Sequence, residues 1–275
     1  MSSAQPIKIL IANRSEIACR LIRAYSLWPN MHTVALFTPS EKDATHVRLA
    51  TASVALPGEG PRAYLDAANI VNIAKNEGCW GIAPGYGFLS EDAGLVRLCE
   101  NEGIVFIGPS SEQLAQLGNK MSARSLAADA GVPVLNGTKT VLDRGSSITD
   151  VLAFGKSLGP ASRIILKAAA GGGGRGIRII DDSSDERAIS MAYEACQREA
   201  HASFGDGSLF AERYLDGAKH IEVQLLGDGT GEVCHFWERA ARNQEYRNTK
   251  TNRKQKSPKS ECIEIVSANN AITCY

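Results

Sequence analysis

Hydrophobic positions follow two different periods over the first hundred residues. The apolar run Ile7–Ala12 is typical of a buried strand, and apolar residues then recur at helical spacing at Ile17, Leu21 and Tyr25. The same alternation continues, which predicts strands at 33–37, 80–83 and 104–107 and helices at 65–74 and 95–99. Alternating strands and helices indicate an α/β fold with a mostly parallel, helix-covered sheet.

The pattern changes after residue 108. Ser110 and Gln113 have the spacing of a capping box and predict a helix start, with a second helix ending before Gly131. Two apolar runs at 164–167 and 177–180 flank a glycine-rich loop, which predicts a strand hairpin rather than a strand–helix–strand unit. A helix at 185–200 and strands at 209–212 and 221–226 follow.

Residues 239–260 differ from the rest of the chain. They are rich in Lys and Arg, contain Glu245 as their only acid and have almost no apolar positions. Such a stretch is not expected to bury itself.

Composition and charge narrow the class of protein. The 30 Lys and Arg balance 30 Asp and Glu, which argues against a surface built for nucleic acid or for an anionic membrane. No apolar run approaches the roughly 20 residues of a membrane span, and no leader pattern precedes Ile7. We expect a cytosolic protein, with the mitochondrial matrix as the alternative.

The seven scattered cysteines form no C-x-x-C pair and are expected to be mostly reduced and buried.

The glycine loop is the strongest candidate for chemistry. Gly171, Gly173 and Gly176 satisfy G-x-G-x-x-G, but a strand follows where a dinucleotide fold has a helix. This favours a flexible hairpin whose backbone N–H groups approach phosphate oxygens, with Lys167 and Arg175 as nearby cations. The alternative interpretation is a surface linker.

A second candidate segment is Phe210–Leu215. A strand that ends in the Glu212 carboxylate, with free backbone groups beyond it, is suited to bind the edge of an adenine. Taken alone, Glu212 is more simply interpreted as an exposed carboxylate at a strand end.

Seven motifs occur together, in order and at matching spacings. They are I-A-N-R-x-E-I-A at 11–18, P-G-Y-G-F-L-S-E at 84–91, F-I-G-P at 106–109, G-x-K at 118–120, K-A-x-x-G-G-G-G-R-G at 167–176, E-x-Y-L at 212–215 and H-I-E-V-Q at 220–224. Over residues 7–239 the chain resembles the biotin carboxylase module of biotin-dependent carboxylases, which belongs to the ATP-grasp superfamily.

The resemblance implies a fold and a set of ATP-binding residues. It implies a Rossmann-like pre-ATP-grasp domain at 1–115, an incomplete ATP-grasp domain with a glycine-rich lid at 116–239, and a divergent basic tail at 240–275. The implied phosphate contacts are Lys120 and Lys167, and His220 would face the nucleotide. The lid would contain Gly171, Gly172, Gly173, Gly174 and Gly176, and adenine would be held by Glu212, Arg213, Tyr214 and Leu215.

The resemblance also implies an activity. Family members are ligases that carboxylate biotin with ATP, bicarbonate and Mg²⁺, act on a biotin carboxyl carrier protein or domain, and include homodimers. Ser15 and Ala83 stand where the family commonly has glycine and histidine. After Arg239 the family pattern stops, and with it the segments that supply the magnesium carboxylates and the bicarbonate base, so no metal ligand is assigned here.

From this departure we expect a truncated, ATP-binding portion of a biotin carboxylase that is inactive alone. Two alternatives stay open. One is a non-catalytic binding or interaction module, and the other is a fragment of a different ATP-grasp ligase such as carbamoyl-phosphate synthase.

Overall fold

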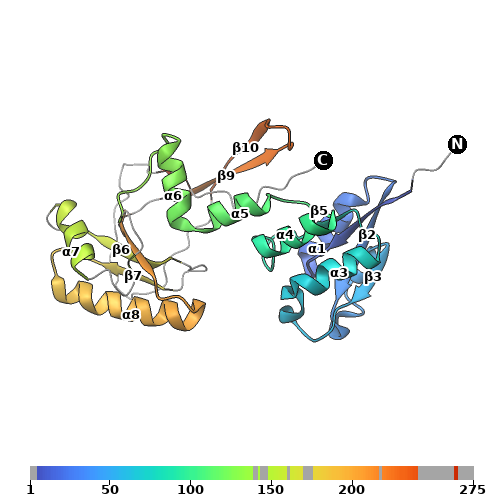
Figure 1. Cartoon of the computed structure of the whole chain (residues 1–275), viewed down its shortest axis with the longest axis horizontal. Helices are drawn as coiled ribbons and strands as arrows, with labels where there is room; N and C mark the ends of the chain where they lie inside the picture. Colours follow the sequence, from blue (N-terminus) through green and yellow to red (C-terminus); the bar gives the residue numbers. More distant parts are fainter. Residues whose placement is uncertain are drawn as a thin grey trace. The chain divides into compact units, whose positions relative to one another are not determined.

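The computed structural model describes residues 5–138, 142, 148–159, 162–169, 176–216, 219–240 and 263–265. It divides into two compact units, one built on the residues up to Gly118 and the other on Asn119–Glu222 (Figure 1). Residues Gly171 to Arg175 of the glycine loop and most of the basic tail lie outside the described residues.

The first unit contains a five-stranded parallel sheet in the order β3-β2-β1-β4-β5. This order places β1 at the centre and confirms the predicted parallel α/β sheet. Its strands are β1 (Ile7–Ile11), β2 (Met31–Phe37), β3 (Ala52–Ala55), β4 (Gly81–Ala83) and β5 (Val105–Phe106). Its helices are α1 (Ser15–Tyr25), α2 (Thr45–Leu49), α3 (Ala67–Asn76), α4 (Ala93–Glu102) and α5 (Ser111–Gly118), with 3-10 turns at Pro39–Glu41 and Pro61–Leu65.

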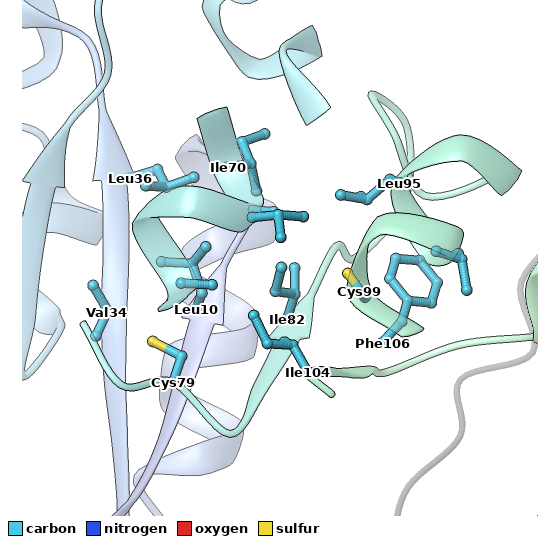
Figure 2. Packing of buried hydrophobic residues seen from close by; sticks show 14 of the residues in the cluster. Leu10, Val34, Leu36, Ile70, Cys79, Ile82, Leu95, Cys99, Ile104 and Phe106 are labelled. Carbon is cyan, nitrogen blue, oxygen red and sulfur yellow. The ribbon is translucent and has the colours of Figure 1, made fainter. Parts of the chain in front are cut away.

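Successive residues of a strand point to opposite sides of the sheet, and residues on both sides of the central strands are buried in core clusters. On one side, Leu10 and Ile82 pack against Ile70 of α3 and Leu95 of α4, as Figure 2 shows. On the other side, residues of β1 and β4 form a separate cluster with Ala18 and Ile22 of α1. Apolar runs without alternation, such as Ile9 to Ala12, are the result of this two-sided burial.

Helix starts follow the local sequence. The Asp66 and Asp92 side chains accept hydrogen bonds from the first turns of α3 and α4. The predicted capping box at α5 is confirmed, since the Ser110 N–H donates to Gln113 Oε1 at 2.9 Å and the Gln113 N–H donates to Ser110 Oγ at 3.2 Å.

The second unit contains an antiparallel sheet in the order β7-β6-β8. Its strands are β6 (Ile164–Ala168), β7 (Ile177–Ile180) and β8 (Leu209–Arg213), and its helices are α6 (Lys120–Asp129), α7 (Ile148–Ser157) and α8 (Glu186–Phe204). The predicted hairpin is therefore confirmed. Leu166 and Ala168 of β6 pack in one core cluster with Ile189 and Cys196 of α8. Strand alternation then directs Lys167 to the opposite face of the sheet.

A further sheet has the order β10-β9-β11, formed by β9 (Lys219–Gly227), β10 (Val233–Ala240) and β11 (Ile263–Ile265). Four of the described cysteines, at 19, 79, 99 and 196, are buried free thiols, and Cys234 is exposed. Within the described ranges, no helix combines the length and the hydropathy that crossing a membrane requires.

Candidate nucleotide site

Two of the sequence motifs meet at the carboxyl edge of the first sheet. Asn13 follows β1 and is fully buried, and its Nδ2 donates to the carbonyl oxygens of Pro84 at 2.7 Å and Tyr86 at 2.9 Å, just after β4. Between them Gly85 has φ +66°, and a Cβ there would lie 2.6 Å from Ile17 Cγ2. The asparagine and the glycine of these motifs therefore have a structural role, holding two strand ends together.

Ser15, the residue that replaces a family glycine, has φ +50°. It is the first residue of α1. The backbone at this position is left-handed, a conformation that glycine alone adopts without a steric penalty. This explains why glycine suits the position that Ser15 occupies here.

In the second unit, three residues predicted from the sequence come together from three elements. Lys167 on β6 donates from Nζ to Glu212 Oε2 on β8 at 2.7 Å. The two strands pair with Ile165 opposite Glu212, so Lys167 is its diagonal neighbour on the same face. Lys120 begins α6, where Asn119 caps the helix, and it interacts electrostatically with both Lys167 and Glu212.

Sequence analysis missed a fourth member of this group, Arg124. Its Nη1 contacts Glu212 Oε1, and its Nη2 donates to the carbonyl oxygen of Leu135 at 2.6 Å. The signal available in the sequence was its position four residues after Lys120, which places both side chains on one face of α6.

The cluster is cationic and partly buried, with the buried Glu212 carboxylate at its centre. The side chains of Glu212, Lys167 and Arg124 are only 6%, 19% and 20% exposed. Burial and, next, the charge of Lys167 lower the pKa of Lys120, although Glu212 partly opposes this effect. Three cations thus gather around the Glu212 carboxylate, an arrangement that suits a polyphosphate ligand.

Backbone hydrogen bonds hold the two residues that follow Glu212 in place. The N–H groups of Arg213 and Tyr214 donate to the carbonyl oxygens of Asn136 and Arg163 at 2.8 and 2.9 Å. The Arg163 guanidinium also lies 4.4 Å from the centre of the Tyr214 ring. Leu215 is half-buried.

The remaining predicted residues are described only in part. Gly176 has φ +65°, and its carbonyl oxygen accepts hydrogen bonds from Ala168 N at 2.8 Å and Cys196 Sγ at 3.1 Å. Gly171, Gly172, Gly173 and Gly174 lie outside the described residues. For His220 the structure describes only the backbone, on β9.

A divalent metal fits this part of the site less well than a polyphosphate does. Among the described residues, no group of three or more His, Cys, Asp or Glu side chains is arranged to hold a metal ion. Glu212 is already engaged by Arg124 and Lys167. The described residues therefore do not assemble a magnesium ligand set.

Two family models match the chain. Residues 5–114 match the biotin carboxylase N-terminal domain, and residues 119–258 match the ATP-binding domain of the carbamoyl-phosphate synthase L chain. The second match extends past Arg239, where the resemblance drawn from the sequence motifs ends.

Individual relatives agree. Pyruvate carboxylase of Bacillus subtilis is 43% identical over 242 residues, which are 87% of this chain and 20% of that protein. Biotin carboxylase 1 of the same organism is 37% identical over 236 residues, which are 84% of this chain and 50% of that protein. The chain therefore spans half of the length of the biotin carboxylase and a fifth of the length of the pyruvate carboxylase.

Solved structures agree as well. The biotin carboxylase domain dimer of Hydrogenobacter thermophilus 2-oxoglutarate carboxylase, in complex with MgADP, ADP and bicarbonate, has a TM-score of 0.78 and 40% identity, over 86% of this chain and 51% of that one. A biotin carboxylase–β,γ-ATP complex from Campylobacter jejuni has a TM-score of 0.78 and 37% identity, over 85% and 50%.

The parallel sheet, the glycine hairpin and the buried cationic cluster define an ATP-grasp protein preceded by its Rossmann-like domain. Within that class, the chain belongs to the biotin carboxylase family.

Proposed function

We propose that this chain forms the ATP-binding portion of a biotin carboxylase, whose reaction is the ATP- and bicarbonate-dependent carboxylation of biotin. The observation that carries the proposal is the meeting of Lys120, Lys167 and Glu212, from α6, β6 and β8, in one cluster around the buried Glu212 carboxylate. The match of residues 5–114 to the biotin carboxylase N-terminal domain favours this ligase over carbamoyl-phosphate synthase.

In the proposed site each described residue has one task. Lys120 and Lys167 bind phosphate oxygens, and their burial strengthens that attraction because little water screens it. Glu212, Arg213, Tyr214 and Leu215 bind the adenine edge. The N–H groups of Arg213 and Tyr214 already donate to Asn136 and Arg163, so they are not the free backbone groups expected from the sequence. When bound, ATP supplies the phosphoryl group that activates bicarbonate. By the family resemblance alone we also assign Gly171–Gly174, Gly176 and His220 to the ATP site; Gly171–Gly174 lie outside the described residues, and only the backbone of His220 is described.

The domain boundaries follow the same proposal. Residues 1–115 form the pre-ATP-grasp domain, residues 116–239 form part of the ATP-grasp domain, and residues 240–275 form a basic tail. In the complete enzyme we expect a biotin carboxyl carrier protein or domain as the partner, and a homodimer as the assembly.

Thermal melts with and without ATP test the nucleotide site. Ligand at about 100 times Kd stabilises a native site by about 2.7 kcal/mol, so the transition should rise with ATP. Lys167→Met should abolish the rise. Lys156→Met, at an exposed lysine of α7, should keep it. A wild-type transition indifferent to ATP would favour a non-catalytic module.

We further propose that the chain alone does not turn over. It spans half the length of the biotin carboxylase relative, and its described residues assemble no magnesium ligand set. The measurement is bicarbonate-dependent ATP hydrolysis with free biotin. Turnover at the rate of a full-length family member would refute this expectation while leaving the ATP site intact.

A further inference from the structure

The Glu212 carboxylate is shared between two cations of different chemistry, a guanidinium and an ammonium. One oxygen contacts Arg124, and the other accepts from Lys167 at 2.7 Å. Because each cation occupies a different oxygen, either one can leave without displacing the other. The charge of Glu212 is buried, so it must keep at least one partner in every state of the site.

Arg124 is the cation that is fixed in place. Its Nη2 is anchored to the Leu135 carbonyl oxygen at 2.6 Å, independently of Glu212. The chain also packs closely around it at Gly137, which bridges to Glu212 of β8. A Cβ at position 137 would lie 2.8 Å from Arg124 Nη2, 2.9 Å from the Ala211 carbonyl oxygen and 3.2 Å from Glu212 Cγ.

Lys167 has the side chain better suited to change partners. Its ammonium is a point charge on a flexible stem, whereas the guanidinium of Arg124 is a rigid fork. Lys167 also faces the like charge of Lys120. A polyphosphate between the two lysines would relieve that repulsion and draw Lys167 away from Glu212.

We infer that Arg124 is a positioning residue that keeps Glu212 paired while Lys167 transfers from this carboxylate to a phosphate of the bound nucleotide. The inference rests on the proposed ATP site. Without Arg124, Lys167 would be the remaining one of the two cations that contact Glu212. Phosphate binding would then have to break the Lys167–Glu212 ion pair.

Inorganic tripolyphosphate is the probe, because it engages the lysines without an adenine, and calorimetry on the full chain measures its affinity beside that of ATP. Arg124→Gln retains a donor for the Leu135 carbonyl oxygen but removes the charge. Tripolyphosphate should then bind roughly 10- to 100-fold more weakly, the range expected for one charge-assisted hydrogen bond. Arg124→Lys retains the charge and should bind close to wild type.

A double-mutant cycle separates this role from a general loss of structure. In a Glu212→Gln background the carboxylate that Arg124 is inferred to keep paired is gone, so adding Arg124→Gln should cost tripolyphosphate affinity almost nothing. Arg198→Gln, at a 73%-exposed arginine of α8, is the matched control and should change neither affinity. If Arg124→Gln does not fold, Gly137→Ala displaces the guanidinium with its charge intact and should weaken tripolyphosphate binding in the same Glu212-dependent way.

The outcomes are distinct. Wild-type chain that binds neither tripolyphosphate nor ATP overturns the proposed function together with this inference. Wild-type chain that binds both, with equal affinity in Arg124→Gln or with strictly additive losses in the cycle, overturns the inference alone.

Discussion

Ser15 carries a conformational cost that a single substitution should relieve. At φ +50° a side chain costs about 1–2 kcal/mol relative to glycine, while glycine loses about 0.4–1 kcal/mol through the greater freedom of the unfolded chain. We expect Ser15→Gly to stabilise the protein by about 0.5–1 kcal/mol in urea unfolding. Ala24→Gly, at an exposed ordinary position of α1, should instead destabilise it by about 1 kcal/mol. A loss for both variants would contradict the strain argument.

Asn13 is the second position where one side chain decides a local structure. Asn13→Ala removes the donor to the carbonyl oxygens of Pro84 and Tyr86 and leaves the buried Pro84 acceptor unpaired, so we expect a loss of about 2–3 kcal/mol in the free energy of unfolding. Asn13→Asp should be at least as damaging, since it turns carboxylate oxygens toward carbonyl oxygens. Asn72→Ala, on the exposed side of α3, is the control and should stay within about 0.5 kcal/mol.

At the scale of elements, the turn after β2 depends on an ionised carboxylate. Glu41 Oε2 accepts from the Thr38 N–H at 3.1 Å, the Thr38 hydroxyl at 2.9 Å and the Tyr64 hydroxyl at 2.8 Å, and Oε1 lies 2.8 Å from Arg14 Nε. Burial alone would raise the pKa of Glu41, but these hydrogen bonds and the Arg14 charge outweigh it and lower the pKa below the usual 4.5.

The lowered pKa of Glu41 makes the stability of the folded protein depend on pH. A lowered pKa in the folded state contributes stability above the unfolded-state value near 4.5, and this stability is lost as the pH falls through the lower folded-state pKa. Glu41→Gln should therefore be less stable than wild type at pH 7, and the difference should shrink below about pH 4.5. Urea unfolding of both proteins between pH 7 and pH 3 measures it. A difference independent of pH would show that shape, and not charge, holds the turn.

The start of α6 should make ATP binding sensitive to alkaline pH. Because the pKa of Lys120 is lowered, this lysine loses its charge at a lower pH than an ordinary lysine, and phosphate affinity should fall with it. Lys120→Arg retains the charge across this range and should flatten the decline between pH 7 and 10. Lys156→Arg should leave the decline unchanged. A decline that persists in Lys120→Arg would assign it to another group.

Elements with strong apolar periodicity were predictable, as were the short buried strands β4 and β5, but some exposed or very short elements were not. In β1, α1 and α8 the apolar residues follow a single strand or helix pattern, and the predicted bounds of these elements agree with the structure within a few residues. β3 was missed because Ala52–Ala55 is a largely exposed edge strand without an apolar alternation, and α2 has only five residues.

The site was predictable only where residue type indicated chemistry. Lys167 stands beside the glycine loop, and Glu212 stands at a strand end, so both were named from the sequence. Their ion pair depends on the register of β6 with β8, which no local pattern encodes. The spacing of Arg124 from Lys120 places both on one face of α6, but the tertiary contact with Glu212 is what makes Arg124 part of the site.

At the scale of the whole molecule, each unit has its own core. The clusters of the first unit draw only on residues between Ile9 and Leu114, and the cluster of the second unit only on residues between Leu142 and Ala211. We expect residues 1–118 expressed alone to unfold cooperatively in urea and to keep the near-ultraviolet signal of packed aromatic side chains such as Tyr64 and Phe88. A broad, non-cooperative transition would mean that this unit depends on the rest of the chain.

The order of elements along the chain has a consequence for synthesis on the ribosome. The last strand of the first sheet, β5, ends at Phe106, so that sheet can close during translation, before β6 at Ile164–Ala168 has been made. The cationic cluster has no such early stage, because Arg124 and Glu212 are 88 positions apart. During translation the first domain can thus fold well before the residues of the cationic cluster come together to bind a nucleotide.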